Sequence, residues 1–244
     1  MIGARTNREG GPGALAAALV GKTPCYGFHL AEKRKPQVVI RVQADTRDWS
    51  IAHFGALGYH TGKLVGNRIP FFSGINPGPD QLKALGAAMA ATGAVALYHV
   101  EGVTPEAVRI PYDISGLEAI PVEADEIQHL FTDMPVEAVA VGCPHCSPAE
   151  LTTIAGLLVG KLVTKPLYVF AAQGVIEKNQ RTADSIEKSG ARVFADTCMV
   201  VSPVMEQYSA IMVNSGKALA YVPDMCGAAA RIGTIEECVR VATE

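Results

Sequence analysis

The sequence lacks several features that mark common functional classes. Its 244 residues contain no apolar run of about 18 residues, so no membrane-spanning helix is expected. Only 18% of the residues are charged and the formal net charge is −3, which argues against a nucleic-acid binder that relies on a general basic field. Aromatic residues make up 6%, so the core is expected to be mostly aliphatic. We therefore expect neither a membrane nor a nucleic acid as a partner.

A secretory signal is also missing from the pattern near the N-terminus. The apolar segment 15–20 is too short for the hydrophobic region of a signal peptide, and no small-residue cleavage pattern follows it. We therefore expect a cytoplasmic protein. In that compartment the six cysteines are expected to be thiols or metal ligands rather than disulfides.

Short β-branched runs alternate along the chain with alanine-rich or amphipathic segments. Strands that alternate with helices predict parallel sheets. We therefore predict an α/β fold of parallel or mixed sheets with flanking helices, and a sub-domain boundary in the proline-rich segment 105–121. The expected strands are 38–42, 94–100, 138–142, 167–172, 191–195 and 210–214.

A short segment rich in cysteine follows the strand 138–142. It contains Cys143, His145 and Cys146, and it ends where Ser147 and Glu150 form the capping box of a new helix. A helix N-terminus lowers the pKa of a nearby thiol, which favours a thiolate and hence metal ligation. The alternative is a packed turn of small residues.

Cys198 follows the strand 191–195 in a comparable position. In α/β folds ligands bind beyond the carboxyl ends of the strands, so Cys143 and Cys198 on equivalent strand ends predict a shared metal site. Taken alone, Cys198 is slightly more typical of a buried core cysteine.

A third candidate segment follows the strand 210–214. Ser215 is expected to cap a helix, Gly216 lets a ligand approach closely, and Lys217 lies in the first helical turn. A positive charge there opposes the helix dipole. The placement becomes favourable when a carboxylate or phosphate binds at the same helix end. The alternative is a solvated lysine.

The polar, glycine-rich segment 3–15 makes a similar case. Arg5 and Arg8 can hold a carboxylate or phosphate through paired hydrogen bonds, and Asn7 and Glu9 can orient hydroxyl groups. The glycines allow a nest of backbone N–H groups before the helix that follows. We expect these four side chains to line a binding site.

Four segments together resemble the catalytic large subunit of the aconitase X family, and the resemblance covers essentially the whole chain, residues 1–244. It implies an aconitase-type α/β fold and an iron–sulfur hydro-lyase that removes water from a hydroxylated carboxylic acid. Known activities of the family are dehydration of mevalonate 5-phosphate in archaeal isoprenoid synthesis and of cis-3-hydroxy-L-proline in bacteria. The segments are "GARTNREGGP" (3–12), "AVGCPH" (140–145), "DTCMVVSP" (196–203) and "VNSGKA" (213–218).

The resemblance also implies specific roles for residues. Of the three cysteines that hold the family's 4Fe–4S or 2Fe–2S cluster, two carry over to Cys143 and Cys198. The segments 3–9 and 214–217 carry over as loops that face the substrate. The family's catalytic base is a serine on a small swivelling domain. That domain is absent from this sequence, so a separate small subunit is implied as the partner, and mevalonate 5-phosphate is the preferred substrate.

The sequence departs from the family at its start. Family members have a substantial segment, with the third cluster cysteine, before the motif that Met1 nearly adjoins here. We therefore expect a chain without that part, with an exposed apolar patch beside the segment 3–15. Two alternatives stay open: an inactive fragment without a cluster, and a zinc-binding module built on Cys143, His145 and Cys146.

Overall fold

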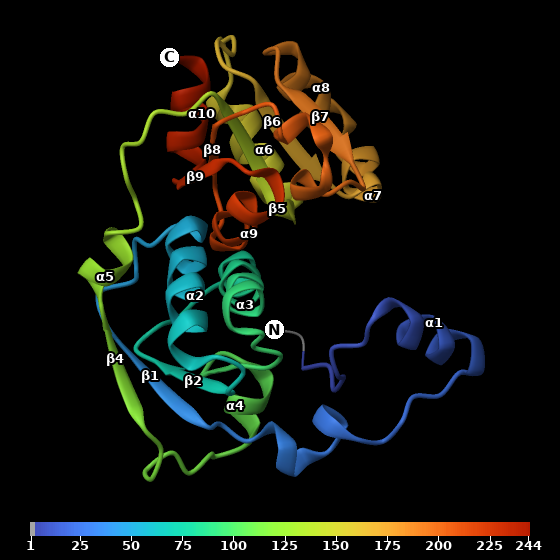
Figure 1. Ribbon diagram of the computed structural model, residues 1–244, viewed down its shortest axis with the longest axis vertical. Helices are drawn as coiled ribbons and strands as arrows, with labels where there is room; N and C mark the ends of the chain where they lie inside the picture. Colours follow the sequence, from blue (N-terminus) through green and yellow to red (C-terminus); the bar gives the residue numbers. More distant parts are fainter. Residues whose placement is uncertain (1–2) are drawn as a thin grey trace.

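The computed structural model describes residues 3–244 as two α/β halves, which lie one above the other in Figure 1. The first half contains a four-stranded sheet in the order β3-β2-β1-β4, and the second a five-stranded sheet in the order β7-β6-β5-β8-β9. Every described strand pair is parallel, as the alternation of strands and helices predicts. The strands are β1 (Val38–Gln43), β2 (Pro70–Ser73), β3 (His99–Val100), β4 (Ala119–Glu123), β5 (Ala138–Cys146), β6 (Leu167–Ala171), β7 (Arg192–Ala195), β8 (Ala210–Val213) and β9 (Ala229–Ile232).

Two long helices, α2 and α3, cover the first sheet and separate it from the second half (Figure 1). They approach each other closely because glycines of α2 face α3: a Cβ atom at Gly58 would meet the Leu85 carbonyl, and one at Gly62 would lie 3.1 Å from the Met89 carbonyl oxygen. The paired helices therefore form one closely packed layer under the second half. The helices of the first half are α2 (Ile51–Val65), α3 (Pro79–Gly93), α4 (Pro105–Arg109) and α5 (Ala124–Gln128).

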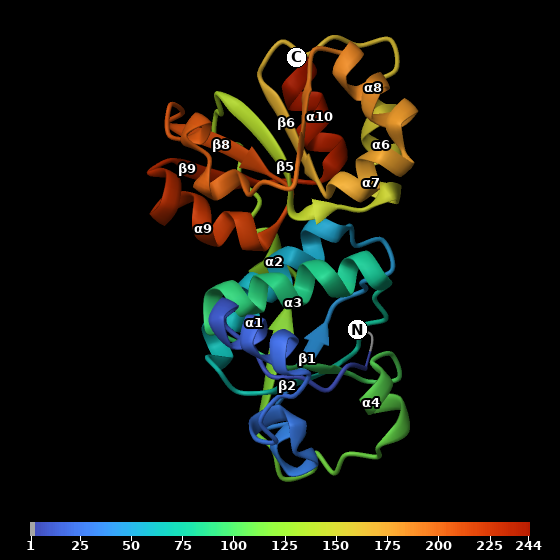
Figure 2. The ribbon, with the colours of Figure 1, turned by 90° about the vertical axis from the view of Figure 1, so that its right-hand side faces the viewer.

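The second sheet is covered on both faces, as Figure 2 shows. Helices α6, α8 and α10 pack on one face around Leu151 and Ile186, and α9 packs on the other around Val222. Because both faces of β5 are buried, its residues belong alternately to the two cores. The helices of this half are α6 (Pro148–Leu157), α7 (Gln173–Lys178), α8 (Gln180–Lys188), α9 (Gly216–Cys226) and α10 (Ile235–Thr243), with the 3-10 turns η3 (Met199–Val201) and η4 (Pro203–Met205).

Three boundaries differ from the sequence-based expectation. The chain passes to the second half between 129 and 137 rather than within 105–121, because β4 still pairs with β1. Only His99–Val100 of the expected strand 94–100 is paired, since Ala94 ends α3 in a left-handed conformation (φ 56°). The strand expected at 138–142 continues through Cys146, so Cys143 lies on a strand and not in a loop.

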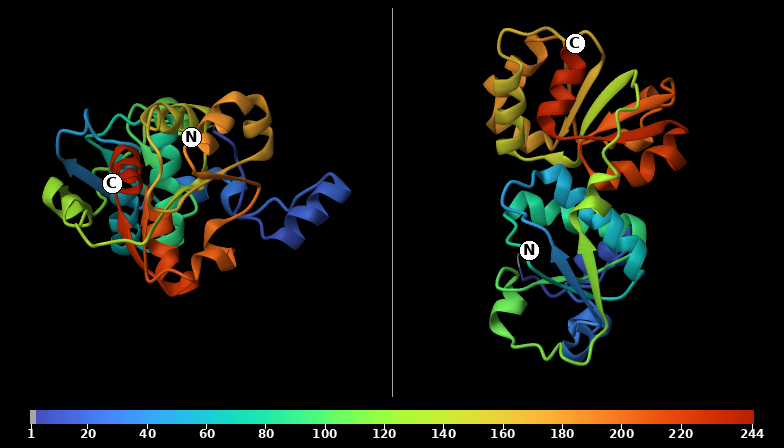
Figure 3. Two further views of the ribbon diagram at one scale, coloured as in Figure 1. Left: turned by 90° about the horizontal axis from the view of Figure 1, so that it is seen from above. Right: turned by 90° about the vertical axis from the view of Figure 1, so that its left-hand side faces the viewer.

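An arm formed by residues 3–35 precedes the first sheet, and its helix α1 (Gly11–Val20) stands out from the rest of the chain (Figure 3). No residue of α1 is buried, and Leu15, Leu19 and Val20 are 62%, 78% and 67% exposed. The expected apolar patch beside the opening segment is therefore confirmed. Even this helix is short, and within residues 3–244 no helix combines the length and apolarity that crossing a membrane requires.

Candidate functional site

Three segments with candidate residues meet at the carboxyl edge of the second sheet. Cys143 lies near the end of β5, Cys198 follows β7, and Lys217 stands in the first turn of α9 after β8. Because the strands are parallel, their carboxyl ends share one edge, where α/β proteins commonly bind ligands. The structure brings these side chains close enough for Cys198 and Lys217 to act electrostatically on the Cys143 thiol.

The Cys143 thiol is buried, with 5% of the residue exposed. Burial raises the pKa of this thiol to about 11; the ammonium group of Lys217 opposes the rise, and the thiols of Cys198 and Cys226 add to it. The lowered pKa expected at the N-terminus of α6 is therefore wrong. The thiol belongs to the core on the α9 face, where the loss of hydration is the largest influence on its pKa. A metal that bound here would have to displace the thiol proton.

The segment after β8 is hydrogen-bonded to β5 on both sides of Cys143. The Ser215 hydroxyl donates to the Cys143 carbonyl, and the Asn214 amide oxygen accepts from the Gly142 N–H at 3.3 Å. Ser215 also accepts from the Ala218 N–H at 3.0 Å, so its expected role as the cap of α9 is confirmed. Because both of these bonds are internal, contact between Ser215 and a substrate stays a prediction.

Cys143 and Cys146 do not form a joint site. Residues three apart on a strand point to opposite faces, and Cys146 packs in the core of α6 and α10 whereas Cys143 packs in the core of α9. The His145 ring is engaged elsewhere, with Nε2 2.8 Å from the Thr197 carbonyl oxygen. Within residues 3–244 no three His, Cys, Asp or Glu side chains are arranged to hold a metal ion. The zinc-binding alternative built on Cys143, His145 and Cys146 is therefore wrong.

The opening segment makes its contacts with the arm and the first half. Arg5 lies 3.6 Å from the Glu106 carboxylate, and Arg8 donates to the Ala94 carbonyl at 2.9 Å. The Asn7 side chain closes the base of the arm, since its amide oxygen accepts from the Phe28 N–H at 2.7 Å and its NH2 group donates to the Tyr26 carbonyl at 3.1 Å.

Glu9 is the exception in the opening segment. One of its carboxylate oxygens is buried and accepts no hydrogen bond from the described residues. The other lies close to Gly13, where an added Cβ atom would be 3.3 Å away. No described contact joins Glu9, or the other three candidates of this segment, to Lys217. Binding of a substrate by Arg5, Asn7, Arg8 and Glu9 therefore stays a prediction.

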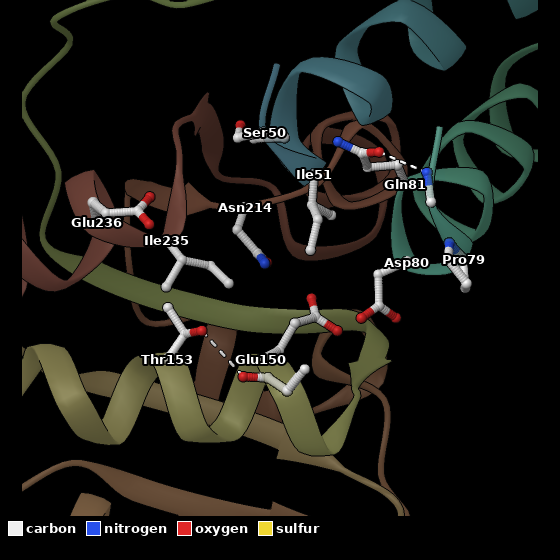
Figure 4. A pocket seen from close by; sticks show the side chains of 13 residues that line it. Ser50, Ile51, Pro79, Asp80, Gln81, Glu150, Thr153, Asn214, Ile235 and Glu236 are labelled. Atoms are coloured by element: carbon white, nitrogen blue, oxygen red, sulfur yellow. Dashed lines mark hydrogen bonds between the residues drawn. The ribbon is translucent and has the colours of Figure 1, made fainter. Parts of the chain in front are cut away.

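A cavity of about 400 Å³ lies at the junction of the two halves (Figure 4). Its wall is formed by the N-terminal turns of four helices: Ile51 of α2, Asp80 of α3, Glu150 of α6 and Glu236 of α10. Asn214 connects the cavity to the segment after β8. The cavity has no signature in the sequence, because its lining comes from segments of both halves.

An ion-pair network crosses the same junction. Lys83 of α3 lies 2.7 Å from the Glu150 carboxylate and 3.1 Å from that of Asp80, and the Ser147 hydroxyl donates to Asp80 at 2.8 Å. Burial lowers the pKa of Lys83, but these two carboxylates outweigh burial and leave the pKa raised. Lys83 also donates to the His145 carbonyl at 3.3 Å. The first half is thereby bonded to the segment that carries Cys143.

Two family descriptions match the chain. Residues 36–132 match the aconitase X second domain, and residues 136–244 match the aconitase X third domain. The boundary between the two matches coincides with the crossing between the two halves of the structure. Together the matches include both sheets, both candidate cysteines and the segment after β8.

Individual relatives agree with the family match. The chain is 51% identical to the phosphomevalonate dehydratase large subunit of Methanosarcina mazei, over 100% of this chain and 61% of that protein. It is 31% identical to the cis-3-hydroxy-L-proline dehydratase of Hypocrea jecorina, over 100% of this chain and 44% of that protein. The crystal structure of Thermococcus kodakaraensis aconitase X in its holo-form superimposes with a TM-score of 0.90 at 41% identity, over 99% of this chain and 64% of that one. The chain thus spans about three fifths of the length of its archaeal relatives.

Proposed function

This chain belongs to the aconitase X family, and from that premise we propose that it is part of the large subunit of a hydro-lyase that dehydrates mevalonate 5-phosphate. The observation that carries the proposal is the meeting of Cys143, Cys198 and Lys217 at one edge of the second sheet. Two thiols beside a cation suit a metal cofactor and an anionic substrate. The chain is 51% identical to a phosphomevalonate dehydratase large subunit but 31% identical to a cis-3-hydroxy-L-proline dehydratase. This difference favours mevalonate 5-phosphate as the substrate.

The donor set fits an iron–sulfur cluster in part. Cys143 and Cys198 are soft thiol donors close enough to interact electrostatically, and they would hold a 4Fe–4S or 2Fe–2S cluster. The described residues contribute no third ligand to this pair, so we infer that the third comes from outside them. When bound, an iron with an open coordination position supplies a Lewis acid for the hydroxyl group that leaves.

Lys217 is proposed to bind the carboxylate or phosphate of the substrate. Its ammonium group and the N-terminus of α9 both contribute positive potential at the same place. The ammonium charge and the partial positive charge of the helix N-terminus repel each other in the free chain. An anion bound between them is attracted by both. Lys217 would thereby orient the substrate and stabilise the negative charge that builds up when a proton is removed beside the carboxylate.

The catalytic base is proposed to come from a separate small subunit with the swivelling domain. Relatives of the chain carry the name large subunit, which supports a partner of this kind. Dehydration needs a base that is near the proton to be removed and can be excluded from water once the substrate is bound. A swivelling subunit meets both needs by closing over the edge where Cys143 and Lys217 lie.

The test is an assay of water elimination by the native complex, purified without air. Wild type is compared with Cys143→Ser, Cys198→Ser and Lys217→Ala, with mevalonate 5-phosphate and cis-3-hydroxy-L-proline as separate substrates. Each serine variant is expected to lose bound iron and sulfide together with activity. Lys217→Ala is expected to weaken substrate binding by about 1.5–3 kcal/mol, which is about 10–150-fold, because it removes a hydrogen bond between charged groups.

Two control variants make the result specific. Cys25→Ser changes an exposed thiol of the arm, and Lys161→Ala changes an exposed lysine of the second half, so both should behave as wild type. Turnover of cis-3-hydroxy-L-proline alone would overturn the proposed substrate. Equal binding by wild type and Lys217→Ala would show that Lys217 is a solvated lysine. A native complex without iron, sulfide or activity would favour the inactive fragment.

A further inference from the structure

We infer that His145 is a positioning residue that holds Cys198 beside Cys143. The inference rests on the function proposed above, because it assigns a role to a residue between the two proposed cluster ligands. His145 stands two residues after Cys143 on β5, and its ring reaches the segment that carries Cys198. One side chain thus connects the two thiol-bearing segments.

The direction of the hydrogen bond follows from chemistry. The Nε2 atom of His145 lies 2.8 Å from the Thr197 carbonyl oxygen. A carbonyl oxygen can only accept, so Nε2 carries the proton and donates it. Because Thr197 immediately precedes Cys198, the bond fixes the main chain at the point where the second thiol-bearing residue begins.

The segment around Cys198 needs such a bond because it is irregular. It lies between β7 and η3, Asp196 has a left-handed backbone (φ 50°), and Cys198 is exposed. Its start is held by the Asp196 N–H, which donates to the Ala171 carbonyl at 3.1 Å. Among the described residues, the bond from His145 is the hydrogen bond that reaches residues 197–198 from another segment.

His145 is itself held from the opposite side. Its carbonyl oxygen accepts from Lys83 at 3.3 Å, and Lys83 is fixed by its ion pair with Glu150. The main chain of His145 is therefore bonded to the first half while its ring is bonded to the Cys198 segment. Residues of α3, α6 and β5 are thereby connected to the segment that carries Cys198.

The experiment compares three substitutions at this position. His145→Leu removes the donor, His145→Asn keeps an amide donor that is too short to reach Thr197, and His145→Gln keeps an amide nitrogen near the place of Nε2. Hydrogen–deuterium exchange of residues 196–202 is measured on the full chain, and iron and acid-labile sulfide are measured on the native complex. His129→Gln, at an exposed histidine of the first half, is the control.

The expected pattern separates positioning from general structure. His145→Leu and His145→Asn should speed exchange in 196–202 about fivefold, the effect of one lost hydrogen bond, and should lower iron and sulfide per chain. His145→Gln should restore both quantities, and the control should match wild type. The inference is overturned if the Leu and Asn variants exchange as slowly as wild type, or if His145→Gln is as impaired as they are.

The same data distinguish this inference from the proposed function. If the wild-type complex binds no iron or sulfide, the cluster proposal fails, and the exchange rates of 196–202 still decide whether His145 holds the segment. If iron and sulfide are present and exchange is unchanged in all three variants, the cluster proposal stands and the role of His145 is refuted. Should His145→Leu fail to fold, the Asn and Gln variants carry the comparison.

Discussion

The two halves of the chain share one plan, a parallel sheet flanked by helices, but they use the carboxyl ends of their strands differently. At that edge of the first sheet, β1 is followed by an exposed ion pair between Asp45 and Arg47. No cysteine lies between residues 36 and 132. At the equivalent edge of the second sheet, Cys143, Asn214 and Ser215 are buried. Ser215 donates to the Cys143 carbonyl, and Asn214 accepts from the N–H of the preceding Gly142. The same topology thus carries different residues at this edge in the two halves, and function depends on such residues rather than on the fold.

The first half is joined to the second by two contacts. Glycines allow α2 and α3 to pack as one layer, and this layer meets α9 where Gly55 and Gly216 bring two backbones together. Lys83 adds the second link between the halves. The first link ends beside Ser215, which donates to the Cys143 carbonyl, and the second ends at His145. The comparison therefore predicts that changes at the junction disturb the site of the second half even when they lie in the first.

The largest effect is expected for Gly216→Val. A Cβ atom at Gly216 would clash with the carbonyl oxygen of Gly55, which is backbone and cannot move aside cheaply. We expect the free energy of unfolding to fall by about 3 kcal/mol or more, as for strong overpacking. Urea unfolding followed by circular dichroism measures the change.

The matched control for that substitution is Gly156→Ala in α6. A Cβ atom there would meet no atom within 4 Å, and alanine favours the helix over glycine by up to about 1 kcal/mol. This variant should be as stable as wild type or more so. A Gly216→Val chain with unchanged stability would show that the two halves do not depend on this backbone contact.

A smaller loss is expected for Lys83→Met. The substitution leaves Glu150, whose side chain is 4% exposed, without its cation, and it also removes the donor to the His145 carbonyl. We expect a loss of about 2–3 kcal/mol, which is less than for a fully buried ion pair because the Lys83 side chain is 23% exposed. Thermal and urea unfolding measure it.

A double-mutant cycle then separates the ion pair from the packing of the lysine stem. Glu150→Gln keeps an oxygen to accept from the Ser147 N–H but removes the charge. Lys83→Met combined with Glu150→Gln should be less destabilised than the sum of the two single variants. Lys161→Met, at an exposed position, should stay within about 0.5 kcal/mol of wild type. Strict additivity in the cycle would contradict a direct pair across the junction.

The stability of the chain is expected to depend on pH through His99 of the first half. Burial lowers the pKa of His99 from its ordinary 6.5, although the hydrogen bond to the Arg34 carbonyl opposes the shift. As the pH falls below 6.5 the unfolded chain takes up a proton before the folded chain does, so stability is lost on acidification and is fully present above that pH. Urea unfolding of wild type between pH 8 and pH 5 should show this loss.

His99→Gln serves as the comparison for that profile. Glutamine keeps a donor for the Arg34 carbonyl but does not titrate, so its stability should depend less steeply on pH in this range. The difference in the free energy of unfolding between wild type and His99→Gln should be largest at pH 8 and should become smaller toward pH 5. Parallel profiles for the two chains would exclude His99 as a source of the acid sensitivity.

The smallest effect on stability is expected for a double substitution in the arm, Leu15→Glu with Leu19→Glu. Both leucines are exposed, at 62% and 78%, and glutamate is nearly as good a helix former as leucine. The free energy of unfolding should change by less than about 0.5 kcal/mol. Self-association of the purified chain should fall, because the apolar surface of α1 is interrupted by charge. Sedimentation velocity measures this, and a wild-type chain that is already monomeric would contradict it.

Local pattern was sufficient to predict much of the fold. The parallel sheets follow from the alternation of strands and helices, and the capping box of Ser147 and Glu150 follows from residues three apart. The resemblance to aconitase X depends on short motifs that keep their order along the chain. These features are determined by neighbours in sequence, so they are visible without a structure.

The environment of the candidate site was decided by tertiary structure alone. Sequence position suggested a lowered pKa for Cys143, but packing under α9 raises it. The short spacing of Cys143 and Cys146 suggested a joint site, but β5 continues through both and sends them to opposite cores. The junction cavity and the bonds of Lys83 join residues more than 60 positions apart. Burial and distant pairing depend on how the two halves meet, and no local pattern of residues records that.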